Sequence, residues 1–299
     1  MTRRHFPRNC QIGLGSAFLG QMFDGTTGAA VSAAALPSPN PLAERPGMLP
    51  RRAKNVIYLH MAGSPPQHET FDYKPELAKR HMELCPEEMI AGKTFAFIKG
   101  RPKLMGPTYP FRQYGETGQW VSDRLPNIAQ HADDLCVIKS LYTDQFNHAP
   151  AQLLLHTGNS QFGGASLGSW VTYGLGSENH NLPGFMVMVS GGTQPSGGKN
   201  LWGSSYLPSV FQGVQCRSEG DPILYVGNPK GMSRDIRRKS LDALNQLNRA
   251  ELETYRDAET LTRINQYELA FRMQTSVPEV MDISKEPDYI HEMYGTKPG

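Results

Sequence analysis

Apolar residues gather in three short runs, and each run ends in a loop of glycine, proline or polar residues. The runs are Lys54–Gly63 (KNVIYLHMAG), Asp134–Leu141 (DLCVIKSL) and Gly184–Ser190 (GFMVMVS). Continuous apolar runs of this length, rich in β-branched and aromatic residues, are typical of buried strands in a parallel sheet. Gly63 and the two prolines after it end the first run. The pattern therefore predicts three strands.

Helical patterns lie between and after these runs. Short helices are predicted over residues 73–80 and 149–156 and around Ser166–Gly176. Ser233 is placed to N-cap a further helix. Four apolar residues are expected on one face of that helix: Ile236, Leu241, Leu244 and Leu247. A longer helix follows, with apolar residues Leu252, Tyr255, Leu261, Ile264, Tyr267, Phe271 and Met273.

Strands that end in polar loops, with helices between them, indicate a doubly wound, mostly parallel α/β sheet. In such sheets ligands bind beyond the carboxyl ends of the strands. The loops after Met61, Leu141 and Ser190 are therefore predicted to converge on one edge. No strand pattern occurs after residue 226, so the sheet has few strands for a chain of 299 residues.

The N-terminus has the pattern of an export signal. Paired arginines in Thr2–Phe6 precede the apolar stretch Ile12–Phe23 and the small residues of Gly28–Pro37. This order predicts a twin-arginine signal peptide over residues 1–35, with export to the periplasm or cell envelope. The alternative is a basic tail followed by a surface helix. A proline-rich linker is predicted over residues 36–52, and the main domain over residues 53–299.

Charge and cysteine content exclude several classes of protein. The 30 basic and 28 acidic residues nearly balance, and no long basic block occurs, which argues against a nucleic-acid-binding protein. The four cysteines are Cys10, Cys85, Cys136 and Cys216, none with C-x-x-C spacing. This spacing argues against a zinc–thiolate site. Cleavage of the signal would remove Cys10 and leave at most one disulfide.

The loop after the first predicted strand offers metal-ligand chemistry. The segment QHETFD places His68, Glu69 and Asp72 within five positions. Carboxylates in such a loop commonly hold a divalent cation, because hard cations prefer oxygen ligands. The alternative is a capped turn, in which Thr70 or Asp72 caps the helix predicted over residues 73–80.

His148 lies where the helix after the second predicted strand begins. Asn147 is a good N-cap residue, and Pro150 falls in the first turn, where its missing N–H costs little. The positive end of the helix dipole disfavours a charged imidazole, and a metal ligand or nucleophile must be neutral. Asp144 could orient the ring. The alternative is a histidine hydrogen-bonded to backbone in a tight loop.

Two further features have weaker functional interpretations. The glycine-rich segment Ser190–Asn200 contains Lys199 and could cradle an anion, or it is an ordinary surface loop. A carbohydrate-binding module is suggested only by three tryptophans, which are more often core residues: Trp120, Trp170 and Trp202. Three histidines have no obvious partner and are expected to be surface or core residues: His156, His180 and His291.

Four long segments closely resemble one family. They cover residues 55–77, 136–158, 168–185 and 207–225. These segments resemble the DUF1501 proteins, twin-arginine-exported, sulfatase-like members of the alkaline phosphatase superfamily, and the likeness runs over essentially the whole chain. The resemblance implies an alkaline-phosphatase-like α/β fold and a metal-dependent esterase ancestry.

The resemblance also marks departures from the family pattern. In HAPAQLLLHTG, His148 stands where sulfatases carry the Cys or Ser that becomes formylglycine, and Gln152 stands where they carry an arginine. Glu69 stands where relatives usually have aspartate. Family members also continue beyond residue 299, so we expect this chain to be the N-terminal part of a longer protein with an incomplete sheet.

The leading hypothesis is an exported, metal-dependent hydrolase of sulfate or phosphate esters of small molecules or glycans. Glu69, Asp72 and His148 would hold a divalent ion (Ca, Zn or Mg), and His148 would be a ligand or the covalent nucleophile. The alternative is a non-catalytic binding or envelope protein on a degenerate sulfatase-like scaffold. Besides the ester, the expected partner is the twin-arginine export machinery. The oligomeric state is not predicted by the sequence.

Overall fold

The computed structural model describes residues 40–45, 50, 52–95, 97–191, 193–217 and 220–296. The predicted signal peptide over residues 1–35 lies outside this part of the chain, as does most of the predicted linker. No helix among the described residues is long and apolar enough to cross a membrane.

The described chain has a mixed α/β fold with two small sheets. In one sheet, β1 (Phe111–Tyr114) pairs antiparallel with β2 (Gln119–Ser122). In the other, β3 (Met186–Met188) pairs parallel with β4 (Val214–Cys216). The α-helices are α3 (Gln67–Thr70), α4 (Pro75–Lys79), α5 (Glu87–Ile90), α6 (Pro126–Ala129), α7 (His148–Thr157), α8 (Leu167–Leu175), α9 (Arg234–Tyr255), α10 (Ala258–Met281) and α11 (Asp288–Tyr294).

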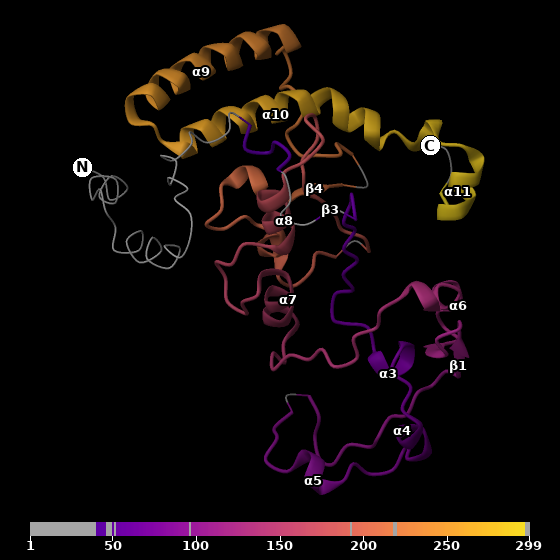
Figure 1. Ribbon diagram of the computed structural model, residues 1–299. Helices are drawn as coiled ribbons and strands as arrows, with labels where there is room; N and C mark the ends of the chain where they lie inside the picture. The colour runs from indigo at the N-terminus through magenta and orange to yellow at the C-terminus, as the bar shows by residue number, and fades with distance from the viewer. Residues whose placement is uncertain are drawn as a thin grey trace, which may run out of the picture.

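The elements are arranged in three tiers (Figure 1). The long helices α9 and α10 fold back on each other at one end of the molecule. The β3–β4 pair lies in the middle with α7 and α8, and α3 to α6 lie at the other end with the β1–β2 hairpin. The extended segment before α3 connects the middle tier to the far end.

The C-terminal helix pair confirms the predicted start at Ser233 and corrects the predicted boundary. The Ser233 hydroxyl accepts a hydrogen bond from the Ile236 amide at 3.2 Å and so caps α9. Arg256 has a left-handed backbone (φ 50°) that ends α9, and the Asp257 side chain caps α10. Leu252 and Tyr255 therefore belong to α9, not to the second helix. The predicted apolar face is also partly wrong, because Ile236 and Leu247 are exposed while Leu241 is buried.

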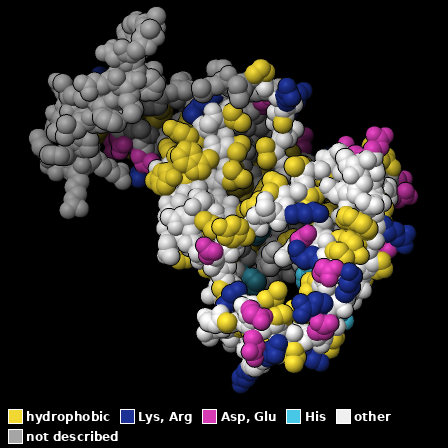
Figure 2. Space-filling model, turned by 60° about the horizontal axis from the view of Figure 1, so that its bottom comes forward, with side chains coloured by type: hydrophobic (Ala, Val, Ile, Leu, Met, Phe, Trp, Pro, Cys, Tyr) yellow, Lys and Arg dark blue, Asp and Glu magenta, His cyan; other side chains and the backbone are white. Residues whose placement is uncertain are grey.

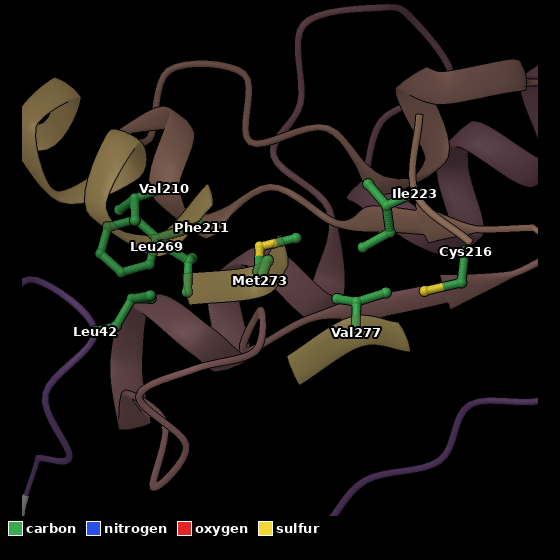
Figure 3. Close-up of a cluster of buried hydrophobic side chains, with 8 residues drawn as sticks. All are labelled: Leu42, Val210, Phe211, Cys216, Ile223, Leu269, Met273 and Val277. Carbon is green, nitrogen blue, oxygen red and sulfur yellow. The ribbon is translucent and has the colours of Figure 1, made fainter. Parts of the chain in front are cut away.

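The main core lies between α10 and the turns around β4 (Figure 3). Leu269, Met273 and Val277 follow one another along one face of α10, at intervals of four residues that keep them on the same side. Phe211 (2% exposed) packs against this face, and Leu42 from the N-terminal part of the described chain joins it. Val210, Cys216 and Ile223 complete the cluster.

Two of the three predicted strands are not strands here. Only the third prediction, over Gly184–Ser190, is confirmed, by β3. Residues 54–63 and 134–141 form no strand among the described residues, and β3 and β4 pair only with each other. A strand needs a neighbouring strand to satisfy its backbone N–H and C=O groups, and without one these groups face water. The fine topology of a doubly wound sheet therefore remains a prediction.

The sequence interpretation missed the β1–β2 hairpin. Its four-residue turn begins at Gly115 and ends at Gly118, both with left-handed backbone. The Asp133 carboxylate accepts hydrogen bonds from the amides of Glu116 and Thr117, at 2.9 and 3.0 Å, and also from the Thr117 hydroxyl. The turn is thus held by a side chain from outside the hairpin.

Candidate functional site

The first extended segment runs antiparallel to α7. The His60 ring lies beside the His156 ring near the end of α7, with ring centres 4.7 Å apart. Three residues later, Gly63 reaches His148 at the beginning of the helix. In doubly wound folds, the carboxyl end of a strand likewise meets the N-terminus of a neighbouring helix. The predicted meeting of the loop after Met61 with the loop before His148 is therefore observed.

Gly63 lies over the face of the His148 ring, at the Cε1 atom between the two nitrogens. A Cβ built on Gly63 would lie 3.5 Å from Cε1 of His148 and 3.8 Å from each ring nitrogen. Gly63 has φ +85°, a conformation that residues with side chains rarely adopt. The Gly63 backbone therefore packs against one face of the ring, and the in-plane lone pairs of the two nitrogens point away from this contact.

His148 is the first residue of α7, as predicted, and it is exposed. Asn147 occupies the N-cap position, but its side chain makes no cap hydrogen bond. The amides of His148 and Ala149 are therefore not used by this cap, and Pro150 has none to offer. Asp144, which was expected to orient the ring, is itself exposed.

The third predicted loop also reaches α7. Gln152 is 4% exposed, and its side-chain carbonyl accepts a hydrogen bond from the Gly197 amide at 3.1 Å. Gly197 belongs to the glycine-rich segment Ser190–Asn200, of which Gly192 lies outside the described residues. Lys199 in this segment is exposed. All three predicted loops thus approach α7, at His148 and at Gln152.

Glu69 is buried in α3 and binds Thr108, which lies 39 residues further along the same chain. Its carboxylate accepts hydrogen bonds from the Thr108 amide at 2.9 and 3.0 Å and from the Thr108 hydroxyl at 2.8 Å. Burial by itself favours the neutral acid, but these bonds, with smaller contributions from His68 and the Tyr109 amide, lower the pKa of Glu69 overall. Glu69 is therefore an ionised carboxylate whose oxygens already have partners.

Asp72 makes an ion pair with Lys74 at 2.6 Å. It does not cap the next helix, because α4 begins after Lys74 and has no side-chain cap. No group of three or more His, Cys, Asp or Glu residues in the described part of the chain is placed to hold a metal ion. The assignment of Glu69, Asp72 and His148 as ligands therefore stays a prediction.

A cluster of rings around His156 was missed. His156 was expected to be an ordinary surface or core residue, yet its ring meets those of His60 and Tyr58. Burial, and secondarily the neighbouring His60, lower the pKa of His156 to about 4. The available signal was that His60 lies in the first apolar run and His156 lies on the last turn of the helix that follows the second run.

The tryptophans differ from one another in exposure. Trp202 is 7% exposed and packs with Leu153 and Leu201, as expected of a core residue. Trp170 is 43% exposed and meets Tyr206, itself 68% exposed, edge to face. Cys85, Cys136 and Cys216 are all free thiols.

Comparison with known proteins gives one match. A family model described as "Protein of unknown function (DUF1501)" matches residues 53–299. No curated protein and no solved structure matches the chain.

Proposed function

The chain belongs to the DUF1501 family, and from that premise we propose that it is an exported hydrolase of sulfate or phosphate esters with His148 as its reactive group. The proposal includes an alkaline-phosphatase-like arrangement of the sheet and export by the twin-arginine route to the periplasm or cell envelope. One observation carries it, namely that His148 is the exposed first residue of α7, beside backbone amides that the Asn147 side chain does not cap.

The chemistry proposed for His148 is covalent catalysis. A neutral ring nitrogen attacks the sulfur or phosphorus atom, the bond to the ester oxygen breaks, and the alcohol leaves with that electron pair and takes a proton from water. Water then cleaves the nitrogen–sulfur or nitrogen–phosphorus bond and restores the imidazole. The amides of His148 and Ala149, which the Asn147 side chain does not cap, point along the helix axis and can bind the anionic oxygens.

The divalent ion that the resemblance implies is part of the proposal, with Glu69, Asp72 and His148 as its ligands. In this structure the three residues do not form a coordination shell, because Thr108 holds the Glu69 carboxylate and Lys74 pairs with Asp72. We therefore assign no step to the ion. Elemental analysis of the wild type, His148→Ala and Asp72→Ala tests this part. Metal lost in both variants supports the ligand set, whereas no metal in any of the three rejects it.

The test of the reactive group is hydrolysis of 4-nitrophenyl sulfate and 4-nitrophenyl phosphate by the full chain. His148→Ala should lower turnover by at least about 100-fold, the lower range for removing a group that acts directly on the reacting atoms. Gly63→Ala should also lower turnover, because its methyl group would contact the face of the ring and relief of the strain at φ +85° would shift that ring. Gly231→Ala is the matched control, since Gly231 has φ +88° but a Cβ added there would meet no atom within 4 Å. Equal turnover in Gly63→Ala and Gly231→Ala would show that the contact between Gly63 and His148 does not position a reactive group.

A second candidate is a non-catalytic binding protein, and Gln152 favours it. At the position where sulfatases carry an arginine, this chain has a buried glutamine that holds the Gly197 loop. Such a residue supports the structure of the loop and offers no charge to a substrate anion. Sulfate or phosphate binding that His148→Ala weakens, without turnover in the wild type, would identify this alternative.

A further inference from the structure

Three aromatic rings from distant parts of the sequence meet on one side of α7. His60 and Tyr58 lie on the extended segment before α3, and His156 lies on the last turn of α7. The two imidazoles have ring centres 4.7 Å apart and planes at 83°. Tyr58 stacks on His60 with centres 6.2 Å apart and meets the edge of His156 at 5.2 Å.

Each of the two imidazoles has a buried ring nitrogen without a hydrogen-bond partner, namely the Nε2 atoms of His60 and His156. A buried polar atom without a partner costs about 1–3 kcal/mol. One species bound between the two rings would satisfy both nitrogens.

The spacing of the rings fits a shared ion. An ion about 2 Å from each Nε2 atom, at tetrahedral or right-angled geometry, holds the two ring centres on the order of 5 Å apart. The observed separation is 4.7 Å. Burial lowers the pKa of His60, and burial together with His60 lowers that of His156. Both rings are therefore neutral near pH 7, as metal ligands must be.

We propose that His60 and His156 bind one divalent transition-metal ion, such as Zn²⁺, Cu²⁺ or Ni²⁺, through their Nε2 atoms. Imidazole ligands suit these ions, whereas Ca²⁺ and Mg²⁺ prefer oxygen. Two protein ligands leave the other coordination positions open to water or to an oxygen of a bound molecule. The ion would also fasten the extended segment to α7. This site uses none of the residues assigned to the ester hydrolase and does not depend on that activity.

The test is zinc binding to the full chain, measured by isothermal titration calorimetry and by the rise in Tm on adding Zn²⁺. His60→Phe and His156→Phe keep an aromatic ring against Tyr58 and remove the unpartnered nitrogen, so neither should destabilise the metal-free protein. Each should weaken zinc binding by at least the roughly 10–100-fold that loss of an outer-shell partner costs, and abolish the rise in Tm. His180→Gln, at an exposed histidine, should bind zinc like the wild type.

Two further measurements separate the possible outcomes. In the wild type, Cu²⁺ should show electron paramagnetic resonance coupling to two imidazole nitrogens, and in each Phe variant to only one. Coupling to one nitrogen in the wild type, or zinc affinity unchanged in both Phe variants, would overturn the proposal. Asp72→Asn and His148→Ala should leave this zinc in place. Zinc lost in those two variants and kept in the Phe variants would assign the ion to the predicted hydrolase site instead.

Discussion

Two regions of the molecule carry similar apolar residues and bury them very differently. In the C-terminal body, formed by α8 to α10 with β3 and β4, Phe211 is 2% exposed and Val277 is 1% exposed. In the junction segments, residues 52–66 and 135–147, Ile57 is 84% exposed and Leu59 is 90% exposed. Figure 2 shows one face of the molecule, where hydrophobic side chains lie among the charged ones at the surface.

The difference comes from the partners within reach of each region. A two-residue turn after α9 folds α10 back along it, so the helix pair forms from nearby sequence. The junction segments would need neighbouring strands on both sides to bury their apolar faces. Among the described residues, β3 and β4 are paired only with each other. Hydrophobic periodicity thus indicates what a segment can bury, whereas an available partner decides whether it does.

The largest expected effect compares two phenylalanines, one in each region. Phe211→Ala should lower the free energy of unfolding by about 3–5 kcal/mol, because it empties a packed site against α10. Phe146→Ala should change it by less than about 0.5 kcal/mol, since Phe146 is 67% exposed in a junction segment. Urea titration of both variants measures the difference. Equal losses would mean that the junction segment is buried in solution and would contradict the difference in burial between the two regions.

Gln152 tests the contact that ties the glycine-rich loop to α7. Gln152→Leu should lower the free energy of unfolding by about 1–3 kcal/mol, because it leaves the Gly197 amide buried without an acceptor. The matched control is Gln246→Leu, at an exposed position of α9, which should be nearly neutral. If both substitutions have the same effect in urea titrations, the loop is not held by this bond.

Much of the helical structure follows from local signals in the sequence. The helix starts near His148 and after Ser233 were predicted from candidate N-cap residues, which act over three or four positions, and Ser233 does cap α9 while the Asn147 side chain makes no cap hydrogen bond. The helix predicted around Ser166–Gly176 is confirmed by α8. The first two predicted strands are not formed, because strand pairing depends on residues far away in the sequence. The hydrogen bonds from the β1–β2 turn to the Asp133 carboxylate were missed for the same reason. At the candidate site, the approach of Gly63 to His148 could be predicted from topology, but the His60–His156 contact depends on the precise position of the segment along α7.

Glu268 provides a prediction with a defined pH dependence. Its carboxylate accepts two hydrogen bonds from Arg238, at 2.6 and 2.9 Å, and one from Asn245, joining α9 to α10. The Arg238 bonds are the main reason that the pKa of Glu268 is lowered below 4.5. Glu268→Gln should lower the free energy of unfolding at pH 7 by about 1 kcal/mol, allowing for solvent screening of this partly exposed pair.

The sign of the pH effect follows from the lowered pKa. A carboxylate with a lowered pKa in the folded state stabilises the protein above its unfolded pKa, and this contribution is lost as the pH falls through the folded value. The difference between wild type and Glu268→Gln should therefore be full at pH 7 and shrink below about pH 4.5. Urea midpoints between pH 7 and pH 3 measure this, with Glu279→Gln, exposed on the same helix, as the control. A difference that stays constant with pH would show that the Glu268 charge is not what joins the helices.

The smallest expected effect is in the junction segment itself. Ile57→Thr keeps a β-branched side chain, so the backbone preference changes little, and it removes apolar surface that is already in water. The free energy of unfolding should stay within about 0.5 kcal/mol of the wild type. Solubility should rise, because an exposed apolar β-prone segment promotes association between chains. Val187→Thr in the second apolar cluster gives the contrast, since Val187 packs against Leu153, Leu201 and Trp202 and should lose stability. A loss in Ile57→Thr that grows with protein concentration would mean that a second copy covers this segment, and the exposed region would then be an interface.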